Sequence, residues 1–269
     1  MKLGLIVPSD DNPYASTLLA ALLAAGDRPA GVLCSHRSAL SRAIACARTQ
    51  GIGAMLRRIR SRYDPTGTVK DEVRRCLARF ASDQKLANWN RRISATCRQL
   101  GIPYLRAAGV NDPAAVAFAQ GLDLDLLLST AGDIYRAGML AAPQIGILNA
   151  HMALLPEFRG MNVLEWSVFC GRPIGVTVHF DAPKIDAGDI VVARELLIKP
   201  GDTLATLRAR SLTLNVTLML EAVRLLRADA TGCRRPGDGP GRQYFVMHHR
   251  LRAIVERRVQ RLAGSYSAR

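Results

Sequence analysis

The sequence lacks the features that mark a membrane-spanning, secreted or disulfide-stabilised protein. No apolar run reaches the roughly 18 residues that a membrane-spanning helix needs. The start, MKLGLIVPSDD, has neither the length nor the small-residue cleavage site of a signal peptide. The six cysteines form no C-x-x-C pair, so we expect reduced thiols without a disulfide framework. These absences together predict a cytoplasmic protein.

Lysine is also scarce. Only five lysines are present, so arginine supplies most of the 37 basic residues that face 22 acidic ones and produce a net charge of +15. The planar guanidinium is the better partner for phosphate and carboxylate groups. One interpretation is an anionic partner such as a nucleic acid, a nucleotide or an acidic membrane surface. The other is an arginine-rich genome composition, and both stay open.

The order of apolar segments predicts an α/β protein. Residues 2–7 and 30–35 are expected strands with a helix over 14–26 between them, which is a βαβ unit and indicates a parallel sheet. The alternation resumes with expected strands at 102–107, 124–129, 146–149 and 175–180, and expected helices at 112–121, 162–171 and 202–226. We expect residues 1–227 to form the α/β domain and residues 228–269 to form a basic C-terminal extension that ends in a helix.

Residues 37 to about 100 interrupt this alternation with two arginine-rich segments that favour helix. The sequence DPTG at 64–67 separates them, because proline and glycine stop a helix. We expect an inserted helical hairpin that covers the site, binds anions, lies on a membrane or packs as solvated helices against the domain.

Polar side chains converge where two of the predicted strands end. Asn149 and His151 alternate at the end of one strand, so they point the same way. The strand 175–180 is followed by the loop DAPKIDAGDI, which carries Asp186. Sites in parallel sheets form at the carboxyl ends of strands. An amide, an imidazole and a carboxylate there can polarise a carbonyl, stabilise an oxyanion and move a proton.

Other residues of the sequence limit the kinds of catalytic site that can be expected. His151 has no second histidine at ligand spacing, so we expect no metal, and no G-x-S-x-G motif signals a serine nucleophile. His179, inside a strand, is interpreted as a supporting or core residue rather than a catalytic one. Arg159 either meets an acidic group of a ligand or is solvated. Cys170 is expected to be a buried thiol.

The motifs NAHMALLPEFRG and GVTVHFDAPKIDAGDI resemble those of the folate-dependent formyltransferases, which share N-x-H, a following L-L-P and a later D-x-G loop. The stretch STAGDIYRAGML resembles the family's pterin loop and matches it at Gly132 and Ile134. The resemblance runs from about residue 121 to 200. It implies a Rossmann-like formyltransferase fold, a mostly parallel sheet with helices on both faces, here with the inserted helical hairpin.

The resemblance also implies an activity, the transfer of a formyl group from 10-formyltetrahydrofolate to a primary amine. Asn149, His151 and Asp186 match the family's catalytic residues. The formyl oxygen would meet the Asn149 amide and a protonated His151, and Asp186 would relay the amine proton. The folate donor would bind through Gly132, Ile134, Tyr135 and Ile185.

Three departures from the family pattern bear on the acceptor. Met152-Ala153 replaces a Pro-Ser pair, PSDDNPYAS replaces a glycine-rich phosphate loop, and the residues after 227 leave no room for the barrel domain of methionyl-tRNA formyltransferase. The main hypothesis is therefore a small anionic amine acceptor such as an amino-sugar nucleotide. One alternative is a charged tRNA held by the arginine-rich segments. Another is a non-catalytic relative that binds folate or a membrane surface.

Overall fold

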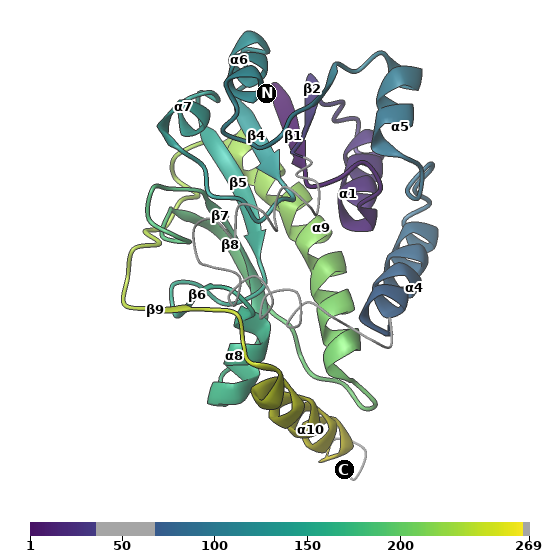
Figure 1. Cartoon of the computed structure of the whole chain (residues 1–269), viewed down its shortest axis with the longest axis vertical. Helices are drawn as coiled ribbons and strands as arrows, with labels where there is room; N and C mark the ends of the chain where they lie inside the picture. The colour runs from purple at the N-terminus through teal and green to yellow at the C-terminus, as the bar shows by residue number, and fades with distance from the viewer. Residues whose placement is uncertain (36–67, 266–269) are drawn as a thin grey trace, which may run out of the picture.

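A seven-stranded mixed sheet forms the centre of the computed structural model, which describes residues 1–35 and 68–265 (Figure 1). Its strand order is β3-β2-β1-β4-β5-β7-β8. The strands from β3 to β5 run parallel, whereas β7 is antiparallel to β5 and β8 is antiparallel to β7. The strand bounds are β1 Leu3–Val7, β2 Gly31–Cys34, β3 Tyr104–Arg106, β4 Leu126–Ser129, β5 Gly146–His151, β7 Gly175–Phe180 and β8 Ile190–Glu195. The expected α/β fold with a mostly parallel sheet is confirmed.

Helices cover both faces of this sheet (Figure 1). One face carries α1, α4, α5 and α9, and the other carries α6 and α7. The helix bounds are α1 Pro13–Ala24, α4 Thr68–Asp83, α5 Ile93–Leu100, α6 Pro113–Gly121, α7 Ala137–Leu140, α8 Val163–Cys170, α9 Leu204–Ala228 and α10 His249–Ser265. The longest helix, α9, begins with a capping box in which the Thr203 and Thr206 side chains bond each other's backbone N–H.

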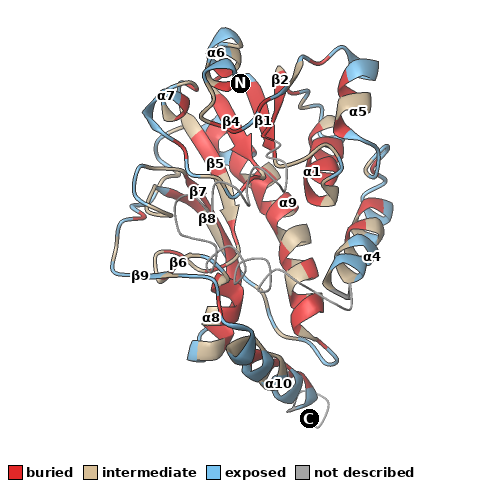
Figure 2. Cartoon of the chain, viewed as in Figure 1, coloured by how far each residue is buried: buried red, intermediate tan, exposed pale blue. Residues whose placement is uncertain are grey.

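The apolar strands are buried on both sides, as Figure 2 shows. In β1, Leu5 and Val7 pack toward α1 and α9, and Ile6 packs toward α6 and α7. Successive side chains of a strand point to opposite faces, so a central strand covered on both faces has a continuous apolar sequence. Burying each such side chain contributes about 1.5–3 kcal/mol. This core holds the strand ends rigidly.

The first half of the predicted helical hairpin lies outside the described residues. Its second half forms two helices, α4 and α5, rather than one. Between them Lys85 and Asn88 adopt positive φ angles of 52° and 59°, a left-handed conformation that an α-helix cannot contain. Leu77 of α4 is fully buried in the core beside α9. The described part of the insertion therefore packs on the domain.

The C-terminal residues fold back onto the domain. A second, two-stranded parallel sheet joins β6, Phe158–Gly160, to β9, Arg242–Tyr244, and α10 packs on α8. Neither short strand was expected from the sequence. Among the described helices, none is long and apolar enough to cross a membrane.

Candidate active site

Four polar side chains share one face of the sheet where β5 and β7 pair. The antiparallel register places Asn149 opposite His179 and His151 opposite Thr177. Paired residues point to the same face, as do residues two apart in a strand. The half-buried Asn149 carboxamide makes no hydrogen bond within the described part of the chain. It is therefore available to a ligand.

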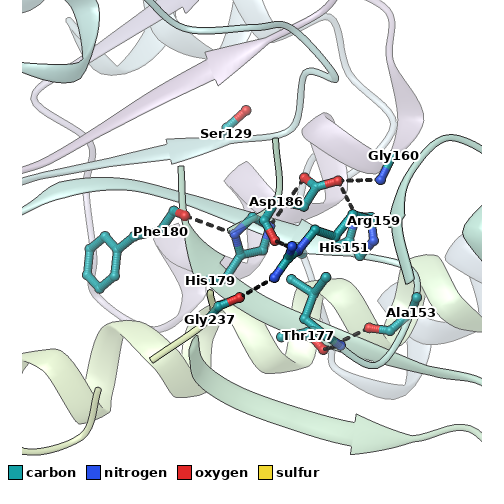
Figure 3. Close-up of polar contacts among 12 residues, drawn as sticks. Ser129, His151, Ala153, Arg159, Gly160, Thr177, His179, Phe180, Asp186 and Gly237 are labelled. Carbon is teal, nitrogen blue, oxygen red and sulfur yellow. Dashed lines mark hydrogen bonds and ion pairs between the residues drawn. The ribbon is translucent and has the colours of Figure 1, made fainter. Parts of the chain in front are cut away.

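Asp186 brings a carboxylate to this face from the loop between β7 and β8 (Figure 3). Its Oδ2 accepts the backbone N–H of Gly160 at 2.7 Å and lies 3.6 Å from His151 Nδ1. Its Oδ1 lies 3.7 Å from His179 Nε2. Asp186 has a φ of +48°, which aspartate tolerates better than most residues. The structure thus brings Asp186 against His151 and places Asn149 on the same face of the sheet, opposite His179.

The two ring nitrogens of His151 both face oxygen atoms. Nε2 lies 2.8 Å from the carbonyl oxygen of Phe158, so it carries a proton and donates it. Nδ1 faces the Asp186 carboxylate. The side chain is only 7% exposed. Its Nε2–H can reach a ligand only if the ring releases Phe158.

His179 is a member of this cluster that the sequence interpretation placed in a supporting role. Its Nδ1 donates to the Phe180 carbonyl at 2.9 Å, which leaves Nε2 as an acceptor without a hydrogen-bond partner. The ring is fully buried, and burial, with the nearby His151, lowers the pKa of His179 to about 4. His179 is therefore neutral at pH 7. The antiparallel pairing with β5, which the sequence pattern did not specify, brings it here.

The same three side chains have the geometry of metal ligands. Single ligand atoms of His151, His179 and Asp186 all lie within 4.8 Å of one another. The expectation of no metal depended on the absence of a second histidine near His151. That premise is wrong, because β7 supplies His179, and the residues by themselves are able to hold a divalent cation.

A pocket of about 450 Å³ lies at the start of β5 and the end of β7, and its lining contains no member of the His151, His179 and Asp186 cluster. Its walls come from α7, the start of β5 and the loop after β7, and include Leu140, Ile147, Phe180, Asp181 and Arg234. The Arg234 guanidinium lies 4.2 Å from the centre of the Phe180 ring. Burial and the nearby Asp186 raise the pKa of Asp181 to about 8, so its carboxyl is largely protonated at neutral pH. The pocket is mainly apolar, with a few polar groups at its edge.

Known proteins match this chain in both sequence and fold. Residues 104–223 match the sequence model of the family described as formyl transferase. A methionyl-tRNA formyltransferase from Syntrophus aciditrophicus is 35% identical over 139 residues, which are 51% of this chain and 44% of that protein. The chain is therefore similar to members of the formyl transferase family over about half of its length. It spans less than half the length of the curated relatives that it matches.

Solved structures of the formyl transferase family share the fold. A glycinamide ribonucleotide transformylase from Symbiobacterium toebii is 23% identical, covers 88% of this chain and 93% of its own, and has a TM-score of 0.53. A sugar N-formyltransferase from a Shewanella species is 17% identical, covers 96% of this chain and 88% of its own, and has a TM-score of 0.54.

None of the residues expected to bind folate lines this pocket. Gly132 is exposed and Ile134 is 69% exposed. The Tyr135 ring is buried, and its hydroxyl bonds Ser129 Oγ at 2.6 Å. Ile185 is half-buried in the Asp186 loop. The pocket wall instead begins two residues after Tyr135, at Ala137.

Two other expectations are wrong. Arg159 is 5% exposed rather than solvated, and its guanidinium bonds backbone carbonyls of Asp186, Gly237 and Gly239. Cys170 is exposed at the last residue of α8 rather than buried. The local sequence specifies neither environment, because the distant segment 237–239 encloses Arg159 and Cys170 lies at the end of α8.

Proposed function

We propose that this protein transfers a formyl group from 10-formyltetrahydrofolate to a primary amine. The observation that carries the proposal is the approach of the Asp186 carboxylate to His151, beside an Asn149 carboxamide that makes no hydrogen bond to the described residues. The match of residues 104–223 to the formyl transferase family model supports the same reaction.

The pocket suits the pterin end of the folate substrate. Its volume of about 450 Å³ lies within the range of small-molecule sites, and such sites are mostly apolar with a few placed polar groups. A flat ring would pack between α7 and the loop after β7, and its amide and amine groups would meet Asp181 and exposed backbone. Arg234, at the same wall, supplies a positive charge.

Formyl transfer needs a group that accepts the amine proton and a hydrogen-bond donor that stabilises the oxyanion. The neutral amine attacks the formyl carbon and forms the new C–N bond, while the carbonyl electron pair moves to oxygen. The Asn149 N–H groups stabilise that oxyanion, joined by His151 if its ring turns from Phe158. Asp186 accepts the amine proton. Collapse of the intermediate breaks the bond to N10, and the proton passes to N10 of the departing tetrahydrofolate.

His179 contributes an acceptor at the point where the amine would arrive. Its Nε2 and Asp186 Oδ1 are both acceptors 3.7 Å apart. Two such atoms favour an N–H donor between them, because unpaired buried acceptors are costly. An attacking amine has the protons to fill that place.

The acceptor is proposed from the curated relatives, which are methionyl-tRNA formyltransferases at 31–36% identity over about half of this chain. They favour a charged tRNA over the small acceptor of the main hypothesis. The net charge of +15 suits a polyanion. An amino-sugar nucleotide is the second candidate, supported by the sequence PSDDNPYAS in place of a glycine-rich phosphate loop, not by fold likeness.

A single assay separates these candidates. The protein is incubated with 10-formyltetrahydrofolate and, separately, methionyl-tRNA, amino-sugar nucleotides and a simple amine, and release of tetrahydrofolate is measured. We expect turnover with methionyl-tRNA, and a KM that rises steeply with salt as phosphate contacts are screened. Turnover with only a sugar nucleotide would reject the tRNA proposal. The absence of turnover with every acceptor would reject transfer and leave the non-catalytic alternative, which liposome flotation and folate binding then test.

A further inference from the structure

Residues 235–244, here called the C-terminal strap, cross the loops that form the site. At one end the backbones of Arg235 and Ile190 bond each other in both directions, at 2.7 and 2.9 Å. At the other end β9 pairs with β6, and Met161 N–H donates to the Tyr244 carbonyl at 3.0 Å. The strap is therefore fixed at the start of β8 and along β6. The Asp186 loop lies between these two points in sequence and in space.

Two glycines let the strap backbone lie directly on the site loops. A Cβ at Gly237 would come within 1.9 Å of the Gly188 carbonyl oxygen, in the Asp186 loop. A Cβ at Gly241 would come within 1.7 Å of the Pro156 carbonyl oxygen, in the segment before β6. Real Cβ atoms do not approach oxygen so closely, so contact this close requires glycine.

Arg159 ties the strap to the Asp186 loop with one side chain (Figure 3). Its Nε donates to the Asp186 carbonyl at 3.2 Å, and Nη2 donates to the carbonyls of Gly237 and Gly239 at 2.8 and 2.9 Å. Within the described residues it pairs with no carboxylate. A buried guanidinium must have its donors satisfied, and here backbone carbonyls from two separate segments supply the acceptors. This geometry holds only while loop and strap stay together.

Arg159 bonds the main chain of Asp186, and the next residue, Gly160, bonds its side chain. The Gly160 backbone N–H donates to Oδ2 of Asp186 at 2.7 Å, so β6 binds both the main chain and the side chain of one residue. Asp186 has a left-handed backbone, a strained conformation that persists only where the surroundings determine it.

We propose that Arg159 and the C-terminal strap are positioning elements that hold the Asp186 carboxylate against His151. The role in catalysis depends on the proposed function; the role in holding the loop does not. Displacement of a reacting group by about 1 Å can lower turnover by about 10²-fold. The C-terminal extension is then a working part of the site rather than an appendage.

The first test compares Arg159→Ala with Arg194→Ala, a matched arginine loss at an exposed ion pair with Glu221. We expect kcat to fall about 10- to 100-fold in Arg159→Ala and to stay near wild type in Arg194→Ala. Hydrogen exchange at the Gly160 amide and across residues 182–190 should accelerate only in the Arg159 variant. Unchanged exchange and unchanged kcat in Arg159→Ala would overturn the proposal.

The second test separates positioning from general stability. Added guanidinium, at concentrations well below those that denature the wild type, should restore part of kcat in Arg159→Ala and none in Asp186→Asn, which keeps the loop but lacks the carboxylate. If Arg159→Ala does not fold, Arg159→Lys takes its place, because one ammonium cannot bond carbonyls on both segments in the same geometry. Wild-type kcat and exchange in Arg159→Lys would count against the proposal.

The exchange measurement also separates this proposal from the proposed function. If the wild type transfers no formyl group, the proposed function fails, and faster exchange at Gly160 in Arg159→Ala still supports the positioning role. If the wild type is active and the variant loses activity without faster exchange, the positioning role fails while the proposed function stands.

Discussion

The ends of β1 and of β5 lie at the same edge of one sheet, and both are followed by polar residues that differ in what they bind. After β1, the Asp10 carboxylate accepts the N–H and hydroxyl of Ser94 at 2.6 and 2.8 Å and so caps α5. At the end of β5, the Asn149 carboxamide has no partner among the described residues. Acidic and amide groups at a strand end therefore do not by themselves indicate a site.

What separates the two ends is how their neighbours use the polar atoms. The N-cap residue of α5 makes no side-chain hydrogen bond, and Asp10 takes this capping role instead. The Asp10 carboxylate therefore stabilises the fold. Asp186 has one oxygen bonded to Gly160, but both oxygens still face imidazole nitrogens. Within the described residues, the second arrangement leaves polar atoms without a complete set of hydrogen bonds, and this is expected of a site rather than of a core.

The largest effect is expected from removing the groups at the end of β5. Asn149→Ala and His151→Ala should keep the fold and lower formyl transfer by about 10²–10³-fold, or about 2.7–4 kcal/mol, because each removes a donor or a proton carrier from the transition state. Single-turnover rates with saturating 10-formyltetrahydrofolate measure this. Turnover within threefold of wild type would refute the assigned roles.

The opposite pattern is expected at the end of β1. Asp10→Ala should lower the free energy of unfolding by about 0.5–2 kcal/mol, the typical cost of losing a helix cap, and leave the kcat of the folded protein nearly unchanged. Urea unfolding and steady-state kinetics on the same preparation provide both values. A large loss of kcat without loss of stability would place Asp10 in the site and remove the distinction between the two strand ends.

A pH-dependent effect on stability is expected at Asp181 in the pocket. Its folded pKa of about 8 lies far above the usual value near 4, so the native state keeps a proton that the unfolded chain has lost. Stability should therefore fall as pH rises from about 4 to 8. The neutral variant Asp181→Asn should lose less stability than wild type between pH 5 and pH 9. Parallel pH curves for the two proteins in urea unfolding would show that Asp181 ionises normally.

The smallest effect is expected at an exposed ion pair remote from both strand ends. The Arg194–Glu221 pair lies on the surface, with side chains 48% and 29% exposed. Glu221→Ala should change the free energy of unfolding by about 1 kcal/mol or less and leave turnover unchanged. The same measurements set the baseline against which the other variants are compared.

Several parts of this arrangement could be predicted from local patterns. The apolar segments at 2–7, 30–35 and 124–129 each contain a strand, because the fully covered strands of a parallel sheet are apolar at every position. The shared direction of Asn149 and His151 follows from the period of two in a strand, although β5 continues to His151 rather than stopping near residue 149.

Residues that act across long distances in sequence could not be predicted in the same way. His179 was placed correctly in a strand, but its position opposite Asn149 depends on the antiparallel direction of β7, which the local sequence does not specify. Arg159 donates a hydrogen bond to the carbonyl of Gly239, which lies 80 residues further along the chain. A glycine in a loop suggests only a turn. The local sequence does not show that a side chain at Gly237 or Gly241 would collide with a carbonyl oxygen from a distant segment.

By itself the sequence determined the α/β class and the shared direction of Asn149 and His151 on one strand, since burial and side-chain alternation are local consequences of residue order. Only the tertiary structure decided which acids cap helices and which face imidazoles, that a second histidine joins the cluster, and that the C-terminal strap closes over the Asp186 loop. These outcomes depend on strand direction and on contacts between segments that are brought together only when the whole core packs.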